Sequence, residues 1–304
     1  MSQPAQFISA STRLCAVLGS PVAHSASPAM HNAAFGALGL NWRYLAFEVE
    51  PKNLRTAIEG AKAMNFAGLN LTVPHKLLAL EMMDELDESA KNWGAVNTIK
   101  FVQSPKTKVQ SPEVRAIGFN TDADAIAKSL REDLKLELRG AKVLLLGAGG
   151  AGRTAALKLA AENVAELFLV NRTRAKAEEI ANEIKNKFPS VKVSPGYPKN
   201  HVDLLLNATS LGLKTDDASP LDETQFSLSQ TRAVYDMIYR PAETKLLAAA
   251  KKSGGKTANG LGMLLHQGAK AFEIWTGKSA PLEVMRRALA AVPSPASKVS
   301  FREH

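Results

Sequence analysis

The chain has 304 residues, of which 45% are apolar and 22% charged, so it is not a disordered protein and is long enough for one large domain or two ordinary ones. Its single cysteine, Cys15, excludes an internal disulfide and a multi-cysteine metal site, and no apolar run approaches the roughly 18–20 residues of a membrane span. The net charge of +9 favours anionic partners, but the basic residues are scattered, which argues against nucleic acid and for an anionic small molecule or cofactor. We expect a cytoplasmic protein that binds neither membranes nor nucleic acid and needs no metal.

Apolar strands and amphipathic helices alternate through the first part of the chain. The pattern predicts strands over Arg13–Gly19, Tyr44–Val49, Gly68–Val73 and Val96–Val102, helices over Pro28–Gly39 and Leu54–Met64, and a further helix that begins at Pro74. The lysine-, serine- and proline-rich segment Ser104–Pro112 is typical of a surface hairpin loop.

The alternation continues with short buried strands. We predict strands over Val143–Leu146, Leu167–Val170, Leu204–Asn207 and Val234–Met237, and helices over Asp122–Leu130, Leu261–Trp275 and Pro281–Ala291. The fold class is therefore α/β, with two units: a first domain over 1–123, a Rossmann-type domain over 124–260, and C-terminal helices in 261–304 that pack back on the first. Mainly parallel sheets would place the sites at the carboxyl ends of strands.

A glycine-rich turn follows the strand at 143–146. Gly147 permits a tight turn, Gly149 lets a pyrophosphate approach the backbone, and Gly152 lets the next helix pack closely. The N-terminus of that helix offers free N–H groups to phosphates. The alternative is a mere glycine-rich turn, but the flanking strands and helix favour a dinucleotide site.

The end of the next strand indicates which dinucleotide binds. An NAD site usually has an acidic residue there to hold the ribose 2′-hydroxyl. This chain instead has Asn171, followed by Arg172, Arg174 and Lys176. Guanidinium groups suit a 2′-phosphate, so NADP is the better prediction. The alternative is a solvated basic start of a helix.

Two serines precede the first predicted helix. Ser25 and Ser27 lie two residues apart on one side of an extended segment, and Pro28 suits the first helical position. Ser27 is therefore either a simple N-cap or, together with Ser25, part of a binding site for a carboxylate.

Polar residues also gather at a strand-to-helix turn. Thr72 shares a strand face with Asn70, and Lys76 lies in the first turn of the following helix, where the dipole disfavours an ammonium. A charge placed against the dipole suggests a role, although a solvated surface lysine is the alternative. Thr121 or Asp122 could do no more than cap the helix that follows them.

In this order, the motifs resemble those of the shikimate dehydrogenase family over nearly the whole chain. They are GSPVAHSASP from Gly19, NLTVPHK from Asn70, GAVNT from Gly94, GFNTD from Gly118, the glycine turn, NRT from Asn171, YDMIY from Tyr235 and NGLGMLLHQ from Asn259. The resemblance implies reversible NADPH-dependent reduction of 3-dehydroshikimate to shikimate, on the route to chorismate and the aromatic amino acids.

The resemblance also implies residue roles by position. Lys76 and Asp122 match the catalytic pair. Matches to substrate contacts are Ser25, Ser27, Thr72, Lys76, Asn97, Asp122, Tyr239 and Gln267. Matches to cofactor contacts are Gly147, Ala148, Gly149, Gly150, Ala151, Asn171, Arg172, Thr173, Arg174, Ala175, Lys176, Met237 and Gly260. The implied assembly is a monomer or homodimer.

Two departures from the family pattern touch the expected rim of the site. Ala123 stands where glycine is common, and His75 stands where an apolar residue is frequent. Alternatives therefore remain open: a quinate/shikimate dehydrogenase with relaxed substrate or cofactor use, or a non-catalytic dinucleotide-binding sensor. The chemistry favours the enzyme, because an ammonium at Lys76 can donate a proton to a developing alkoxide while Asp122 orients it.

Overall fold

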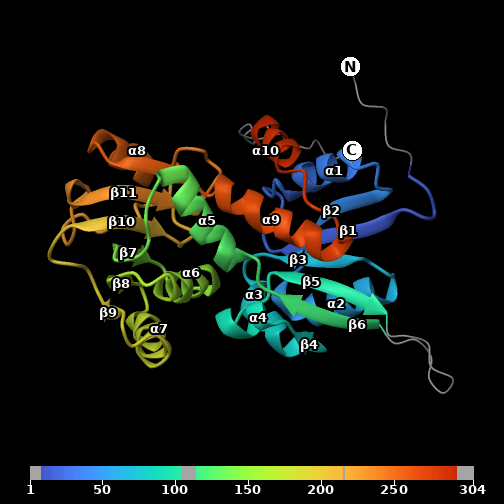
Figure 1. Ribbon diagram of the computed structural model, residues 1–304, viewed down its shortest axis with the longest axis horizontal. Coiled ribbons are helices and arrows are strands. Elements are labelled where there is room, and N and C mark those ends of the chain that lie inside the picture. The colour runs from blue at the N-terminus through green and yellow to red at the C-terminus, as the bar shows by residue number, and fades with distance from the viewer. Residues whose placement is uncertain (1–7, 104–113, 215, 293–304) are drawn as a thin grey trace.

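The computed structural model describes residues 8–103, 114–214 and 216–292 and consists of two α/β units that lie side by side (Figure 1). The predicted hairpin loop at Ser104–Pro112 lies outside the described residues. Each unit is built on a six-stranded sheet. The predicted α/β class with two units is therefore confirmed, while the boundary between residues 123 and 124 stays a prediction.

The first sheet has the strand order β2-β1-β3-β5-β6-β4. Its strands are β1 (Arg13–Gly19), β2 (Trp42–Glu48), β3 (Gly68–Leu71), β4 (Glu85–Leu86), β5 (Thr98–Gln103) and β6 (Val114–Phe119). Its helices are α1 (Ser27–Ala37), α2 (Leu54–Ala63), α3 (His75–Leu78) and α4 (Glu88–Trp93). One hydrophobic cluster packs under α2, and the aromatic cluster with Phe35 and Tyr44 packs under α1.

The first sheet is mixed but mainly parallel, as expected: the pairs β1–β2, β1–β3 and β4–β6 are parallel, and two pairs are antiparallel. Strands β1, β2 and β3 run parallel, but β5 is antiparallel to both β3 and β6. The reason for the antiparallel β5–β6 pair is chain length: only residues 104–113 separate the two strands, fewer than the dozen or so residues that a crossover between parallel strands needs.

The second sheet is parallel at every described pairing, in the order β12-β11-β10-β7-β8-β9. Its strands are β7 (Lys142–Leu146), β8 (Glu166–Val170), β9 (Lys192–Pro195), β10 (Val202–Asn207), β11 (Thr231–Asp236) and β12 (Lys256–Asn259). Helices α5 (Asp122–Leu134), α6 (Gly150–Ala161), α7 (Arg174–Lys187) and α8 (Lys245–Lys252) cover it. The strand order reverses between β7 and β10, so the glycine turn after β7 opens at the crevice where such sheets bind dinucleotides.

Two helices join the two units. Helix α5 leads from the first sheet to the second, and α9 (Leu261–Thr276) crosses back, packing against both α5 and α1 (Figure 1). Helix α10 (Leu282–Ala291) lies on α1. This confirms that the C-terminal helices return to the first unit. Trp275 anchors the return, since its indole N–H donates to the carbonyl of Ile99 at 2.9 Å.

Candidate active site

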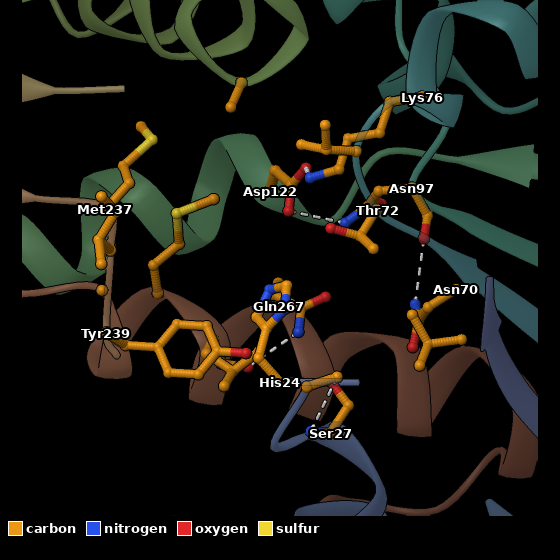
Figure 2. Close-up of a pocket in the computed structure, with 18 of the residues that line it drawn as sticks. His24, Ser27, Asn70, Thr72, Lys76, Asn97, Asp122, Met237, Tyr239 and Gln267 are labelled. Atoms are coloured by element: carbon orange, nitrogen blue, oxygen red, sulfur yellow. Dashed lines mark hydrogen bonds and ion pairs between the residues drawn. The ribbon is translucent and has the colours of Figure 1, made fainter. Parts of the chain in front are cut away.

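A pocket of about 240 Å³ lies between the two units. Its walls include every residue predicted to contact substrate, namely Ser25, Ser27, Thr72, Lys76, Asn97, Asp122, Tyr239 and Gln267. Three of the predicted cofactor contacts also line it: Ala151, Met237 and Gly260. Side chains as far apart in the chain as Ser25 and Gln267 thus converge on one cavity, part of which Figure 2 shows.

Lys76 and Asp122 are in direct contact. The ammonium Nζ of Lys76 donates to Asp122 Oδ2 at 2.6 Å, and the Asp122 side chain is 3% exposed while that of Lys76 is 15% exposed. Lys76 is the second residue of the four-residue helix α3, and Asp122 is the first residue of α5. The ion pair is open to the pocket on one side, so the ammonium is available to a bound molecule.

A network of amides holds Asp122. The Asn97 side-chain amide donates to Asp122 Oδ1 at 2.8 Å, and Asn120 Oδ1 accepts the backbone N–H groups of Asp122 and Ala123 at 3.1 and 3.2 Å. Asn120 therefore caps α5, and the Thr121 side chain makes no capping bond. The possibility that Thr121 or Asp122 serves only as a cap is wrong, because Asn120 fills that position and frees the Asp122 carboxylate for Lys76.

Short hydroxyl-bearing side chains lie at the other end of the pocket, where Ser27 and Tyr239 face Lys76 and Asp122 across the cavity (Figure 2). Ser25 Oγ accepts the Ser27 backbone N–H at 3.3 Å, and the Tyr239 hydroxyl accepts the Ala26 N–H at 3.4 Å. Ser27 begins helix α1, and Ala26 is its N-cap without a side-chain bond. The N-cap alternative for Ser27 is therefore wrong, because the serine already has helical geometry.

Burial raises the pKa of the Tyr239 hydroxyl, so this group stays protonated and can act as a donor at neutral pH. Gln267 projects from α9, and its amide donates to the Leu264 carbonyl at 3.0 Å, which leaves its side-chain oxygen and second N–H free of that bond. The end near Ser27 therefore presents neutral hydrogen-bond donors.

The glycine turn fits a pyrophosphate. Gly149 precedes the first residue of α6, and a side chain placed on it would meet no atom within 4 Å, so its backbone is open to a ligand. A side chain on Gly152 would instead collide with the Gly147 carbonyl, which is why the helix can pack so close to the strand end. Gly150 lies next to α3, near Lys76 and Leu77, so the turn adjoins the Lys76–Asp122 ion pair.

The basic segment after β8 lies on the surface next to the glycine turn. Asn171 braces the turn: its Oδ1 accepts the Ala148 N–H at 3.0 Å, and its amide donates to the Thr173 carbonyl at 2.8 Å. Arg174 is exposed and pairs with Glu178 one helical turn away. Arg172 and Lys176 form no ion pair within the described part of the chain, so both cations are available for a 2′-phosphate.

Five further polar residues line the pocket without having been assigned a contact from the sequence. They are His24, Asn70, Thr209, Ser210 and Arg240. Arg240 directly follows Tyr239, so a cation next to that motif was the available signal. Asn70 accepts from the Tyr44 hydroxyl at 2.7 Å and donates to Thr98 at 2.9 Å, so the first sheet holds it rigidly.

The two departures from the family pattern do not enter the pocket. The His75 ring turns away from it and bonds the Val49 carbonyl through Nε2 at 2.8 Å. Ala123 is fully buried in α5. Among residues 8–103, 114–214 and 216–292, no group of three metal-ligating side chains is close enough to hold an ion, and none of the described helices is both long and apolar enough to span a bilayer.

Comparison with family models covers most of the chain in three consecutive segments. Residues 17–99 match the shikimate dehydrogenase substrate binding domain, 126–211 match shikimate / quinate 5-dehydrogenase, and 260–290 match the shikimate 5'-dehydrogenase C-terminal domain. The first and second segments fall on the two sheets, and the third covers α9 and most of α10.

Known proteins resemble the chain over their full length. The curated shikimate dehydrogenase (NADP(+)) of Methanopyrus kandleri is 42% identical, with 93% of this chain and 96% of that protein covered. A crystal structure of a shikimate dehydrogenase in complex with NADP+ superposes with a TM-score of 0.82 at 40% identity, covering 94% of this chain and 98% of the other. The Thermus thermophilus shikimate 5-dehydrogenase in complex with NADP(H) and shikimate gives 0.77 at 37% identity, with 91% and 98% covered.

Proposed function

The chain belongs to the NADP(+)-dependent shikimate dehydrogenase family, and from that premise we propose how its own residues divide the work of the reaction. The enzyme reduces 3-dehydroshikimate reversibly to shikimate. The observation that carries the assignment of roles is the 2.6 Å contact between Lys76 and Asp122 at the wall of a pocket that adjoins the glycine turn.

Lys76 is the proton donor. Its ammonium faces the cavity, where it can donate a hydrogen bond to the carbonyl oxygen of the substrate and transfer a proton as negative charge develops there. Asp122 keeps the ammonium in place and can accept a hydrogen bond from a neighbouring substrate hydroxyl. Asn97 and Thr72 add short polar side chains at the same end, which suits a ring that carries several hydroxyls.

Ser25, Ser27, Tyr239 and Gln267 bind the carboxylate end of the substrate. Ser27, Tyr239 and Gln267 lie across the cavity from Lys76 (Figure 2), and Ser25 Oγ accepts the Ser27 N–H, so the four groups orient the ring with its reacting carbon toward the glycine turn. The turn at Gly147–Ala151, with Arg172, Arg174 and Lys176 beside it, holds NADPH, and NADPH when bound supplies the hydride. Met237 and Gly260 line the pocket between the two sites.

Absorbance at 340 nm, followed with shikimate and NADP, tests the function directly, and parallel assays with quinate and with NAD measure its strictness. We expect the highest kcat/KM with shikimate and NADP. Lys76→Met is expected to lower kcat about 10²–10⁴-fold while the affinity for NADP stays within a factor of about two. Lys52→Met, which changes an exposed lysine of the same unit, is the matched control. NADP binding without oxidation of shikimate by the unmodified protein would contradict the assignment and favour a sensor.

Assembly and cellular setting stay predictions. We propose a monomer or homodimer in the cytoplasm, where the lone, buried Cys15 would remain a thiol. Light scattering coupled to size-exclusion chromatography distinguishes the two assemblies.

A further inference from the structure

The charges that line the pocket are unequally distributed. At one end the ammonium of Lys76 is compensated by Asp122 at 2.6 Å, so that pair carries no net charge. At the other end Arg240 is the charged residue in the lining, beside the neutral groups of Ser25 and Tyr239. Within the described residues no acidic side chain forms an ion pair with Arg240. The pocket therefore has one uncompensated positive charge, and it lies at the end away from the reacting pair.

Arg240 is held there by two carbonyl groups. Its Nη1 donates to the His24 carbonyl at 3.4 Å, and its Nη2 donates to the Val292 carbonyl at 3.3 Å. The guanidinium carbon lies 6.0 Å from the centre of the Tyr239 ring. A guanidinium has five N–H donors, so two bonds to carbonyls leave three for another acceptor. Carbonyls cancel none of the charge, so the side chain is positioned while its charge stays available.

The surroundings strengthen the effect of this charge. Burial, together with the positive charge of Arg240, lowers the pKa of His24, so the imidazole is neutral at physiological pH and does not supply a cation of its own. Ser25, Ser27 and Tyr239 donate hydrogen bonds but are neutral as well. A carboxylate that leaves water for this end of the pocket would lose hydration energy that neutral donors alone compensate poorly.

We propose that Arg240 is a specificity-determining residue, whose positive charge holds the carboxylate of the substrate at the Ser25–Ser27–Tyr239 end of the pocket. The inference rests on the proposed function, because that function supplies a carboxylate-bearing ring. Arg240 thereby selects acids over uncharged cyclic polyols of the same shape. Arg240 lies in the segment between β11 and α8 of the second unit, so the carboxylate is bound by groups from both units.

Two substitutions separate charge from architecture. Arg240→Gln removes the charge but keeps N–H donors for the carbonyls of His24 and Val292, and Arg240→Lys keeps the charge. Each variant is assayed at saturating NADP with shikimate and with shikimate methyl ester, which has the same ring but no carboxylate. Thermal unfolding and NADP affinity are measured on each, so that a folding defect is recognised.

We expect Arg240→Gln to raise KM for shikimate about tenfold or more, with kcat within a factor of about two, because the lost interaction involves a charged group away from the reacting atoms. With the methyl ester, Arg240→Gln and the unmodified enzyme should give the same KM. Arg240→Lys should recover most of the preference for the acid, and added salt should raise KM for shikimate more in the unmodified enzyme than in Arg240→Gln.

Equal effects of Arg240→Gln on acid and ester would overturn the proposal and assign Arg240 a structural role only, and so would an unchanged KM for shikimate. If Arg240→Gln does not fold, the Lys variant decides: a preference for the acid lost despite the retained charge overturns the proposal. An unmodified enzyme that oxidises neither compound refutes the proposed function instead, so the two failures are distinguishable.

Discussion

Asn97 donates its side-chain amide to Asp122 Oδ1 at 2.8 Å, and this bond determines which carboxylate oxygen faces Lys76. Asn97 immediately precedes β5, and its own carbonyl oxygen Oδ1 accepts the Thr121 N–H at 2.8 Å. A single buried amide thus ties the first sheet to the start of α5. In the proposed mechanism, the orientation of Asp122 toward Lys76 therefore depends on this amide.

Replacing Asn97 with Ala should therefore lower the rate of catalysis without weakening the binding of NADP. Asp122 loses the donor that fixes its rotation, and a buried N–H of Thr121 loses its acceptor. We expect kcat to fall about 10–100-fold and KM for shikimate to rise, with NADP affinity unchanged, in steady-state assays and NADP titrations. Asn53→Ala, at an exposed position of the same unit, should behave as the unmodified enzyme. An unaltered kcat in Asn97→Ala would refute the positioning role.

Arg172 should control the choice between NADP and NAD. It is exposed next to the glycine turn, where a 2′-phosphate can accept its N–H groups. We expect Arg172→Gln to raise KM for NADP about tenfold and to leave KM for NAD unchanged, because NAD lacks the phosphate. Lys185→Gln, at the far end of α7, is the control. An equal change in KM for NADP and for NAD would show that the basic segment does not recognise the 2′-phosphate.

Arg153 should hold the two units together. It extends from α6 to the carbonyls of Trp93 and Gly94 at the end of α4, while its other face pairs with Glu183 at 2.7 Å. Removing a partly buried charged group that makes several hydrogen bonds lowers the free energy of unfolding by about 1–3 kcal/mol. Urea unfolding of Arg153→Met should show a loss of that size, compared with Lys185→Met as the exposed control. A loss below about 0.5 kcal/mol, the range of ordinary surface substitutions, would contradict the prediction.

His31 should make stability depend on pH. Its ring stacks on Tyr44 at 4.3 Å, neither nitrogen has a partner among the described residues, and burial lowers its pKa to about 3 from 6.5. Between these pH values the unfolded chain binds a proton that the native protein does not. The free energy of unfolding is therefore highest above pH 6.5 and decreases as the pH falls toward 3. From pH 7.5 to pH 5 the loss is about 2 kcal/mol.

Urea unfolding at these two pH values measures that loss. The difference in unfolding free energy between the unmodified protein and His31→Phe should change by about 2 kcal/mol between pH 7.5 and pH 5, whatever the cost of the substitution itself. Asn53→Ala, which changes an exposed side chain that does not titrate, should keep a constant difference from the unmodified protein. A constant difference for His31→Phe as well would show that His31 is not kept neutral by burial.

Local patterns predicted most of the elements that carry the site. The strand Arg13–Gly19 has the bounds expected of it. Strand β7 and helix α6 flank the glycine turn, as the glycine motif predicted. Two of the missed elements are weakly patterned. Helix α4 is six residues of mostly polar sequence, and edge strand β12 is partly exposed along its length. Such segments are held by their neighbours and have no apolar period of their own, so no local signal marks them.

The sequence by itself determined the alternation of strands and helices, the phosphate-binding turn, the missing acid at Asn171 and the family of the enzyme, because these depend on residues close together in the chain. Only the tertiary structure decided that the first sheet is mixed, that Asn120 rather than Thr121 supplies the side-chain bonds at the start of α5, and that Ser27 lies inside α1. It also decided that Arg240 contacts His24 from 216 residues away. Those outcomes depend on which surfaces pack together, and packing is a property of the whole folded chain.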